Sequence, residues 1–145
     1  MDATALRQVM EELIPFNRVL GIRVVEIDRG HVRMEIAFRE ELIGDPVRRA
    51  VHGGVISALA DTAGGCAVWS ALDEPTARVS TIDIRIDYLR PGRPETLVAE
   101  GNVVRAGRRV GVADIRLFHP SAPAESIATG KGVYNVVIPK SAPRA

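Results

Sequence analysis

The sequence has few aromatic residues and only one cysteine. Phe, Trp and Tyr make up 4% of the 145 residues, and Cys66 is the single cysteine. An intrachain disulfide and a cysteine-based metal cluster are therefore excluded, and we expect Cys66 to be a small core residue. The three histidines, His31, His52 and His119, are scattered without metal-ligand spacing, so we expect no metal and no other cofactor.

A large excess of charge of one sign is also missing. The 19 basic and 18 acidic residues leave a formal net charge of +1, whereas nucleic-acid binding calls for a strongly basic face. No run approaches about 18 uninterrupted apolar residues, and the N-terminal MDATALRQVMEEL has no signal-peptide core. We expect a cytoplasmic protein with neither nucleic acid nor membrane as a partner. Its length and its 46% hydrophobic content fit one globular domain over residues 1–145.

The chain is organised around the stretch HGGVISALADTAGG at residues 52–65. Ala, Val, Ile and Leu dominate from residue 55 to residue 72 without a proline, which predicts a long buried helix. At 100° per residue, one face of it carries almost only small residues: Gly54, Ser57, Ala58, Asp61, Gly64 and Gly65. A glycine inside a helix destabilises the helix by about 1 kcal/mol relative to alanine. We therefore expect the space left by the missing side chains to accommodate a closely packed second helix, a ligand, or both.

Asp61 is the one carboxylate in this apolar helix. Burying an ionised carboxylate without partners is costly. Asp61 therefore either bonds a neighbour such as Ser57 or serves as a catalytic acid or base. At the start of the helix the amides of Gly53 and Gly54 have no intrahelical partner and suit an oxyanion.

Gly53 and Asp61 are too far apart to act together within one helix. They are eight residues apart, about 12 Å along a helix axis, whereas a reacting carbonyl needs its catalytic groups within about 3–3.5 Å. We therefore expect two copies of the helix, side by side and antiparallel, in a homodimer with shared active sites. The glycine face would provide the room for that approach.

The remaining segments predict one more helix, a connector and several strands. A helix over residues 3–14 ends at Pro15, and residues 15–21 form a connector. Residues 39–51 have the composition of a loop, and the tail 139–145 should be frayed. Alternating residues predict strands over 22–28, 31–38, 79–89, 96–105, 110–118 and 126–138.

The order of these elements predicts an α+β domain in which an antiparallel sheet wraps one central helix. The strand over residues 79–89 has the clearest pattern. Ile82, Ile84, Ile86 and Tyr88 should face the helix, with Thr81 and the charged residues on the other side.

Three motifs resemble those of PaaI-type hotdog thioesterases, a family that hydrolyses acyl-coenzyme A. They are the HGG turn, the helix segment ALADTAGG with Asp nine residues after His, and the strand STIDIRIDYLRPGRPE. The resemblance runs from PFNRVLG to the last strand and implies the hotdog fold. It also implies Asp61 as general base or nucleophile, the Gly53 amide as the group that polarises the thioester carbonyl, and His52 as a residue that shapes the turn. Thr81 would position water.

The sequence departs from this family at one position. Many relatives carry an asparagine shortly before HGG. The residue nearest to that position here is Asp45, whose carboxylate could serve a different role from the asparagine amide. Thr81 also needs a twist or bulge to reach the site, because on a regular strand it lies on the polar face with Asp83. Asp45 and Thr81, with His52 and Gly54, are expected to contact the substrate.

Arginines at loop ends are candidates for holding the coenzyme A phosphates. Arg108 and Arg109 in the turn RAGRR come first, and Arg90 or Arg93 next, because guanidinium groups bind phosphates in forked geometry. A solvated turn would explain these charges equally well.

Two other functions stay open for the same residues. A non-catalytic acyl-coenzyme A sensor could use the same pocket and amides, although such sensors resemble regulators with an attached DNA-binding domain. A hotdog hydratase or dehydratase is less favoured, because its loop pattern of Asp and His is missing. The acyl group, and whether dimers pair further into a dimer of dimers, are left open.

Overall fold

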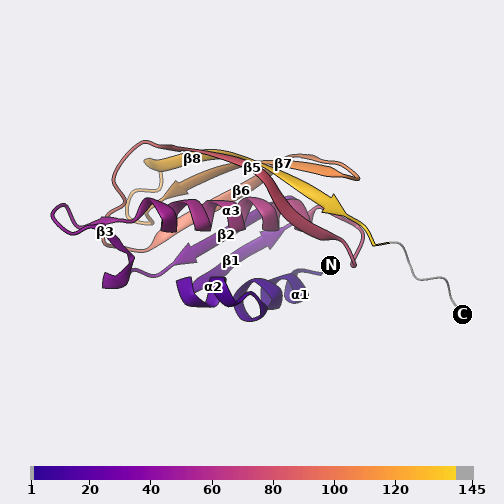
Figure 1. The fold of residues 1–145 in the computed structure, drawn as a ribbon, viewed down its shortest axis with the longest axis horizontal. Coiled ribbons are helices and arrows are strands. Elements are labelled where there is room, and N and C mark those ends of the chain that lie inside the picture. The colour runs from indigo at the N-terminus through magenta and orange to yellow at the C-terminus, as the bar shows by residue number, and fades with distance from the viewer. Residues whose placement is uncertain (1, 140–145) are drawn as a thin grey trace, which may run out of the picture.

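A computed structural model describes residues 2–139 of the chain. An antiparallel sheet curls around one long helix, α3 (Gly53–Ser70), as Figure 1 shows. The predicted α+β architecture with a central helix is confirmed. The tail expected to fray lies largely outside the described residues, which end at Pro139.

The six strands of the sheet follow the order β1-β2-β6-β7-β8-β5. Their bounds are β1 (Ile22–Asp28), β2 (His31–Ile36), β5 (Arg78–Tyr88), β6 (Leu97–Ala106), β7 (Val110–Phe118) and β8 (Ser126–Val137).

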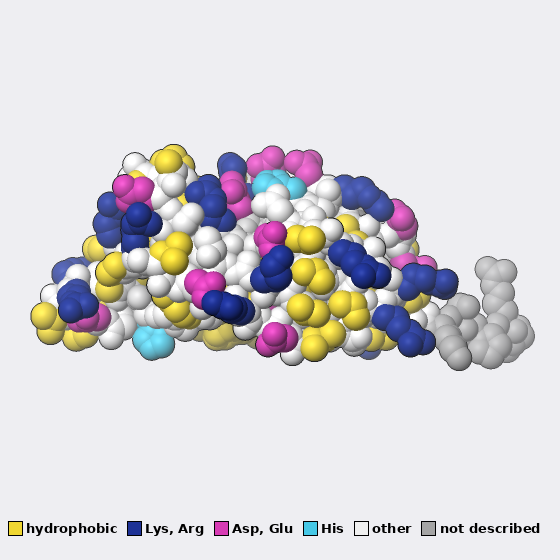
Figure 2. Space-filling view, turned by 90° about the horizontal axis from the view of Figure 1, so that it is seen from above, with side chains coloured by type: hydrophobic (Ala, Val, Ile, Leu, Met, Phe, Trp, Pro, Cys, Tyr) yellow, Lys and Arg dark blue, Asp and Glu magenta, His cyan; other side chains and the backbone are white. Residues whose placement is uncertain are grey.

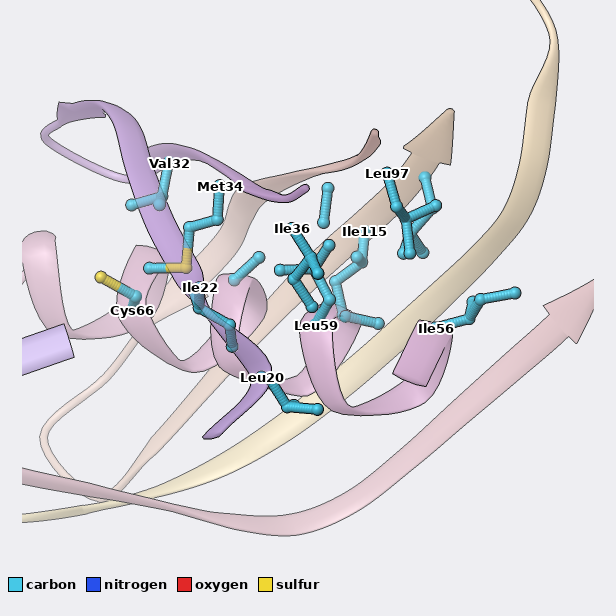
Figure 3. Close-up of a cluster of buried hydrophobic side chains, with 14 of the residues drawn as sticks. Leu20, Ile22, Val32, Met34, Ile36, Ile56, Leu59, Cys66, Leu97 and Ile115 are labelled. Carbon is cyan, nitrogen blue, oxygen red and sulfur yellow. The ribbon is translucent and has the colours of Figure 1, made fainter. Parts of the chain in front are cut away.

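The core lies between α3 and the concave face of the sheet. Figure 3 shows Leu59 and Cys66 of α3 facing Met34 of β2 and Ile115 of β7, all of them buried. Burying one such side chain stabilises the fold by about 1.5–3 kcal/mol. The opposite stripe of α3, which includes Asp61, is only half-buried. The helix is therefore less enclosed in a single chain than its composition predicts.

The N-terminal segment differs from the single helix that the sequence predicts. It forms α1 (Ala3–Gln8), continues as a π-helical turn, η1 (Val9–Leu13), and restarts as α2 (Pro15–Leu20). The connector prediction for residues 15–21 was wrong. Proline has no N–H to lose at the first position of a helix, so Pro15 begins one helix as well as ending another. Gly21, with φ of 70°, ends α2 in the left-handed conformation.

The segment predicted as a loop contains two short strands. A 3-10 turn, η2 (Glu40–Leu42), leads into β3 (Ile43–Asp45), which pairs with β4 (Ala50–Val51). The backbone N–H of His52 then donates to the Leu42 carbonyl at 2.8 Å. These contacts hold the chain immediately before α3, so the start of the helix is anchored.

Strand β5 lies at an edge of the sheet and carries a bulge. Its register with β8 shifts between Thr81 and Asp83, so two residues of β5 oppose one of β8. An extra residue reverses the alternation of side chains. Ile84 and Ile86 pack on the core as predicted, but Ile82 is 58% exposed. The prediction that Ile82 faces the helix was therefore wrong.

The outer face of the sheet is mixed in charge. Figure 2 shows Lys and Arg interspersed with Asp and Glu on this side of the molecule, and Lys131 pairs with Asp114 at 2.7 Å across β8 and β7. Within the described residues, no helix is long and apolar enough to cross a membrane.

Candidate active site

Asp61 lies in the middle of α3, where β5 crosses it. The Thr81 hydroxyl donates a hydrogen bond of 2.8 Å to Oδ1 of Asp61. The bulge at Ile82 makes this possible, because it turns Thr81 toward the helix. The bulge that the sequence required for this contact is therefore present. Among the described residues, no hydrogen bond to the second carboxylate oxygen, Oδ2, is formed, so that oxygen can accept a proton.

A pocket of about 280 Å³ opens beside Asp61. It lies between the half-buried stripe of α3, the start of β5 and the N-terminal helical segment. The lining is mostly apolar and comprises Met10, Ile14, Phe16, Asn17, Asp61, Thr62, Gly65, Cys66, Trp69, Val79, Ser80, Thr81 and Tyr134. A carboxylate at the side of an apolar pocket is the arrangement expected for proton transfer to or from a bound apolar molecule.

The start of α3 presents a free backbone amide. His52 is the N-cap, and its Nδ1 accepts a hydrogen bond of 2.8 Å from the Gly54 N–H. The Gly54 amide is thereby occupied. No hydrogen-bond acceptor for the Gly53 N–H lies within the described residues. Of the two amides that the sequence offered for an oxyanion, Gly53 is the available one.

Tyr88 braces this helix start from β5. Its hydroxyl donates to the Gly53 carbonyl at 3.1 Å and also contacts the Ser57 hydroxyl. A Cβ on Gly53 would meet the Tyr88 ring at 3.4 Å. The ring therefore lies directly against the first turn of α3.

The glycine face of α3 is used differently from the prediction. A Cβ on Gly64 would clash with the Tyr134 hydroxyl, and one on Gly65 would lie 3.2 Å from the same ring. Tyr134, on β8, is 1% exposed and donates to the Asp61 carbonyl at 3.2 Å. Burial and the nearby Asp61 charge raise the pKa of the Tyr134 phenol. At Gly64 the space is therefore filled by Tyr134 and Ile115 of the same chain, whereas Gly65 lies against the Tyr134 ring and also lines the pocket beside Asp61.

Gly53 and Asp61 line different hollows of the single chain. Asp61 lies at the pocket described above, whereas Gly53 lines a separate hollow of about 340 Å³ with Tyr88 and Arg90. Their separation of eight residues on one helix corresponds to about 12 Å. One chain thus holds the two groups apart.

The structure places the other predicted site residues away from Asp61. Asp45 accepts hydrogen bonds from the backbone of Val47 (2.9 Å) and Arg48 (3.0 Å) in its own turn, and no contact with Asp61 is formed. The carboxylate of Asp45 therefore stabilises the turn between β3 and β4.

The candidate phosphate-binding arginines lie at opposite ends of α3. Arg108 lines a hollow with Ala71, just after the helix ends, whereas Arg90 lies near its start. Arg109 adjoins Arg108 in the β6–β7 turn, and Arg93 pairs with Glu95 at 2.6 Å. An 18-residue helix separates the two groups, a length of about 27 Å. A single nucleotide cannot contact both groups within one chain.

Sequence reasoning did not assign a site role to several residues that contact α3. Tyr88 stood within the quoted strand motif, but its contact with the helix start depends on how β5 crosses α3. Tyr134 comes from β8, and Trp69 lies two turns further along α3 than Asp61; neither gave a local signal of a place near the site. Among the described residues, no cluster of three His, Cys, Asp or Glu side chains could hold a metal ion.

Residues 49–122 match the sequence profile of the thioesterase superfamily. A Halobacterium salinarum protein with the provisional name of an esterase is 40% identical, and the match covers 93% of each chain. The Escherichia coli medium/long-chain acyl-CoA thioesterase YigI is 32% identical over 79% of this chain and 84% of its own. The E. coli PaaI structure, from the phenylacetic acid degradation operon, superposes with a TM-score of 0.81 at 26% identity, covering 94% of both chains.

Proposed function

Because this chain belongs to the thioesterase superfamily and is a hotdog thioesterase of the PaaI type, we propose that it hydrolyses acyl-coenzyme A to a free acid and coenzyme A. The observation that carries the proposal is the half-buried Asp61 carboxylate, held by Thr81 beside an apolar pocket. The acyl-CoA thioesterase activity named for YigI, at 32% identity, supports the substrate class.

In the proposed reaction, Asp61 acts on a water molecule next to the thioester carbonyl. Oδ2 accepts a proton as the water oxygen bonds to the carbonyl carbon, while Thr81 holds Oδ1. The negative charge moves to the carbonyl oxygen, which the free Gly53 amide receives at the positive end of α3. The C–S bond then breaks, and the sulfur leaves with the proton from Asp61. Direct attack by Asp61, through an anhydride, uses the same geometry.

The two groups would come from two chains. Three features support a homodimer: the separation of Gly53 and Asp61, the half-buried stripe of α3, and the free edge of β5 in a single chain. An unpaired edge strand is a ready template for pairing with another chain. A two-fold axis between antiparallel helices would place Gly53 of each copy beside Asp61 of the other and create two equivalent sites.

This dimer would also bring the separated arginines closer together. With antiparallel helices, the end of α3 in one chain approaches the start of α3 in the other. Arg108 and Arg109 of one copy would then lie on the same side of the dimer as Arg90 of the other. We propose these arginines as the phosphate-binding groups for coenzyme A.

A panel of acyl-coenzyme A thioesters, tested on wild type and Asp61→Asn, examines this function. We expect wild type to release free thiol and Asp61→Asn to lose about 10²–10⁴-fold in turnover while keeping its fold, since that is the usual contribution of a general base. Near-normal turnover by Asp61→Asn would contradict the mechanism. Tight binding by wild type without any hydrolysis would instead favour the sensor function.

A further inference from the structure

His119 is the one buried histidine among residues 2–139, with 3% of its surface exposed, and it follows β7 directly. Both nitrogens of its ring contact the backbone of one loop, which joins β5 to β6 over residues 89–96. The Arg93 N–H donates to Nε2 at 2.8 Å, and Nδ1 lies 2.9 Å from the Thr96 carbonyl oxygen. The imidazole therefore holds this loop at two points.

The two partners determine which ring nitrogen carries the proton. A backbone N–H only donates, so Nε2 must present a lone pair to Arg93. A carbonyl oxygen only accepts, so Nδ1 must donate its proton to Thr96. The ring is therefore neutral when both contacts are made. A second proton, on Nε2, would turn that nitrogen into a donor facing the Arg93 N–H, and this hydrogen bond would be lost.

The loop over residues 89–96 also contacts the segment that begins α3. The Gly92 carbonyl accepts a hydrogen bond of 2.8 Å from the N–H of Val51, two residues before Gly53. Gly92 is buried, and a Cβ there would lie 3.2 Å from the Val51 side chain and 3.5 Å from that of Ile56 in α3. A displacement of the loop is therefore transmitted to the start of α3 through a hydrogen bond and through direct packing.

We infer that His119 is a positioning residue for thioester hydrolysis: its neutral ring fixes the loop over residues 89–96, and the loop fixes the Gly53 amide. This inference rests on the proposed function, which gives the oxyanion to that amide. Every contact it uses lies within one chain. Protonation of His119 would release the Arg93 N–H and loosen the start of α3, so activity should fall reversibly at acid pH.

Charged side chains occur on the elements around the ring, but none of them bonds it. They are Arg90, Arg93 and Glu95 of the loop, Glu125 of the turn before β8, and Arg116 of β7. Arg93 pairs with Glu95 at 2.6 Å, and Arg116 donates to the Pro123 carbonyl at 2.7 Å. Within residues 2–139, the imidazole has hydrogen bonds to backbone groups alone. Protonation therefore acts directly on the backbone contacts of the loop.

Two amide variants separate the two ring contacts. Glutamine can place a carbonyl oxygen where Nε2 lies and accept from Arg93 without titrating, whereas asparagine reaches only the place of Nδ1. We expect His119→Asn to lower kcat by about fivefold to tenfold at pH 8, the usual worth of one hydrogen bond. KM should change little, because an oxyanion donor acts mainly in the transition state. Equal kcat in wild type and His119→Asn would overturn the inference.

His119→Gln should recover most of kcat and lose part of the activity decline between about pH 8 and pH 5, the range in which histidines change charge. Any contribution of Asp61 and His52 to this decline is common to wild type and His119→Gln, so the difference isolates His119. His31→Gln is the matched control, because His31 bonds Asn102 on the neighbouring strand at 2.9 Å and should leave the decline as in wild type. Identical pH profiles for wild type and His119→Gln would contradict the inference.

Amide hydrogen exchange gives a readout that does not depend on hydrolysis. The N–H of Val51 is bonded to Gly92, and the next N–H, of His52, is bonded to Leu42, both at 2.8 Å. The first amide reports the contact with the loop, and the second is an internal reference. His119→Asn should speed exchange at Val51 about tenfold relative to His52. In wild type the same ratio, corrected for intrinsic rates, should rise as the pH falls from about 8 to 5.

The exchange ratio keeps the test independent of the variants and of the proposed function. The wild-type pH series needs no substitution, so a constant ratio there would refute the role of His119 even if His119→Asn fails to fold. Failure of wild type to hydrolyse any acyl-coenzyme A would refute the proposed function instead. The exchange ratio would then still decide whether His119 holds the start of α3.

Discussion

The Thr81 hydroxyl donates to the Asp61 carboxylate at 2.8 Å, across two elements that are 20 residues apart in the chain. The contact depends on the bulge in β5, because without the extra residue Thr81 would face away from α3. One local irregularity of the sheet thus joins the proposed catalytic carboxylate to the residue that orients it.

Thr81→Val should lower turnover and leave KM nearly unchanged. Valine has a similar shape but lacks the hydroxyl, so Asp61 would lose its orienting donor. A hydrogen bond to a charged group is worth about 1.5–3 kcal/mol, so we expect kcat to fall at least about tenfold. Thr81→Ser should restore much of the rate. Thr129→Val on β8 serves as the control, and an equal loss there would argue against a specific role for Thr81.

Mixing two inactive variants should restore activity. Asp61→Asn removes the carboxylate, and Gly53→Pro removes the proposed oxyanion N–H. Gly53 is the first residue of α3, and His52 before it is extended, so proline fits this position. In mixed dimers one site would hold both defects and the other none. Statistical exchange should recover up to about a quarter of wild-type activity. No recovery after verified exchange would show that both groups act from one chain.

A cysteine at Ser57 should cross-link the dimer. Ser57 lies midway between Gly53 and Asp61, so the proposed two-fold axis makes it face its own copy. Mild oxidation of Ser57→Cys should give a disulfide-linked dimer on a denaturing gel, whereas Ala106→Cys, at the exposed end of β6, should stay monomeric there. Cross-linking of Ala106→Cys alone would indicate a different interface.

Replacing each of two adjacent glycines, Gly64 and Gly65, by alanine should change the free energy of unfolding by different amounts. At Gly64 the new Cβ would clash with the Tyr134 hydroxyl and lie 2.8 Å from Ile115, so Gly64→Ala should lower the free energy of unfolding by about 1–3 kcal/mol. At Gly65 the nearest contact is 3.2 Å, and alanine gains up to about 1 kcal/mol in helix propensity. Urea unfolding of both variants measures the difference. Equal destabilisation would mean that Tyr134 does not fill this room.

Cys66 should be unreactive in the folded protein. Burial raises the pKa of its thiol to about 12, because the thiolate cannot be solvated there. A thiol reagent at pH 8 should modify Cys66 only after unfolding. Since the unfolded thiol ionises near pH 8.5, the free energy of unfolding should fall as the pH rises from about 8.5 toward 12. Cys66→Ala should remove this part of the alkaline decline, and an unchanged profile would assign it to other groups.

The sequence by itself determined the elements whose signals are local. The apolar run after HGG predicts α3, and the alternation of apolar and polar residues on both sides of Arg29–Gly30 predicts the β1–β2 hairpin. Both signals are local, because helix and strand periodicity depend on residues close together in the sequence. The HGG turn and Asp61 also identified the family that the comparisons confirm. Prediction was weaker at Pro15, where one residue both ends a helix and begins another.

Only the tertiary structure decided how distant segments meet. The bulge at Ile82 arises from pairing of β5 with β8, so no pattern within β5 showed that Thr81 would reach Asp61. Tyr134 occupies the room at Gly64 because β8 lies over α3. The pocket beside Asp61 forms where the N-terminal segment, α3 and β5 meet. These contacts join residues far apart in the chain, and their positions follow from the packing of whole elements, which local sequence preferences do not encode.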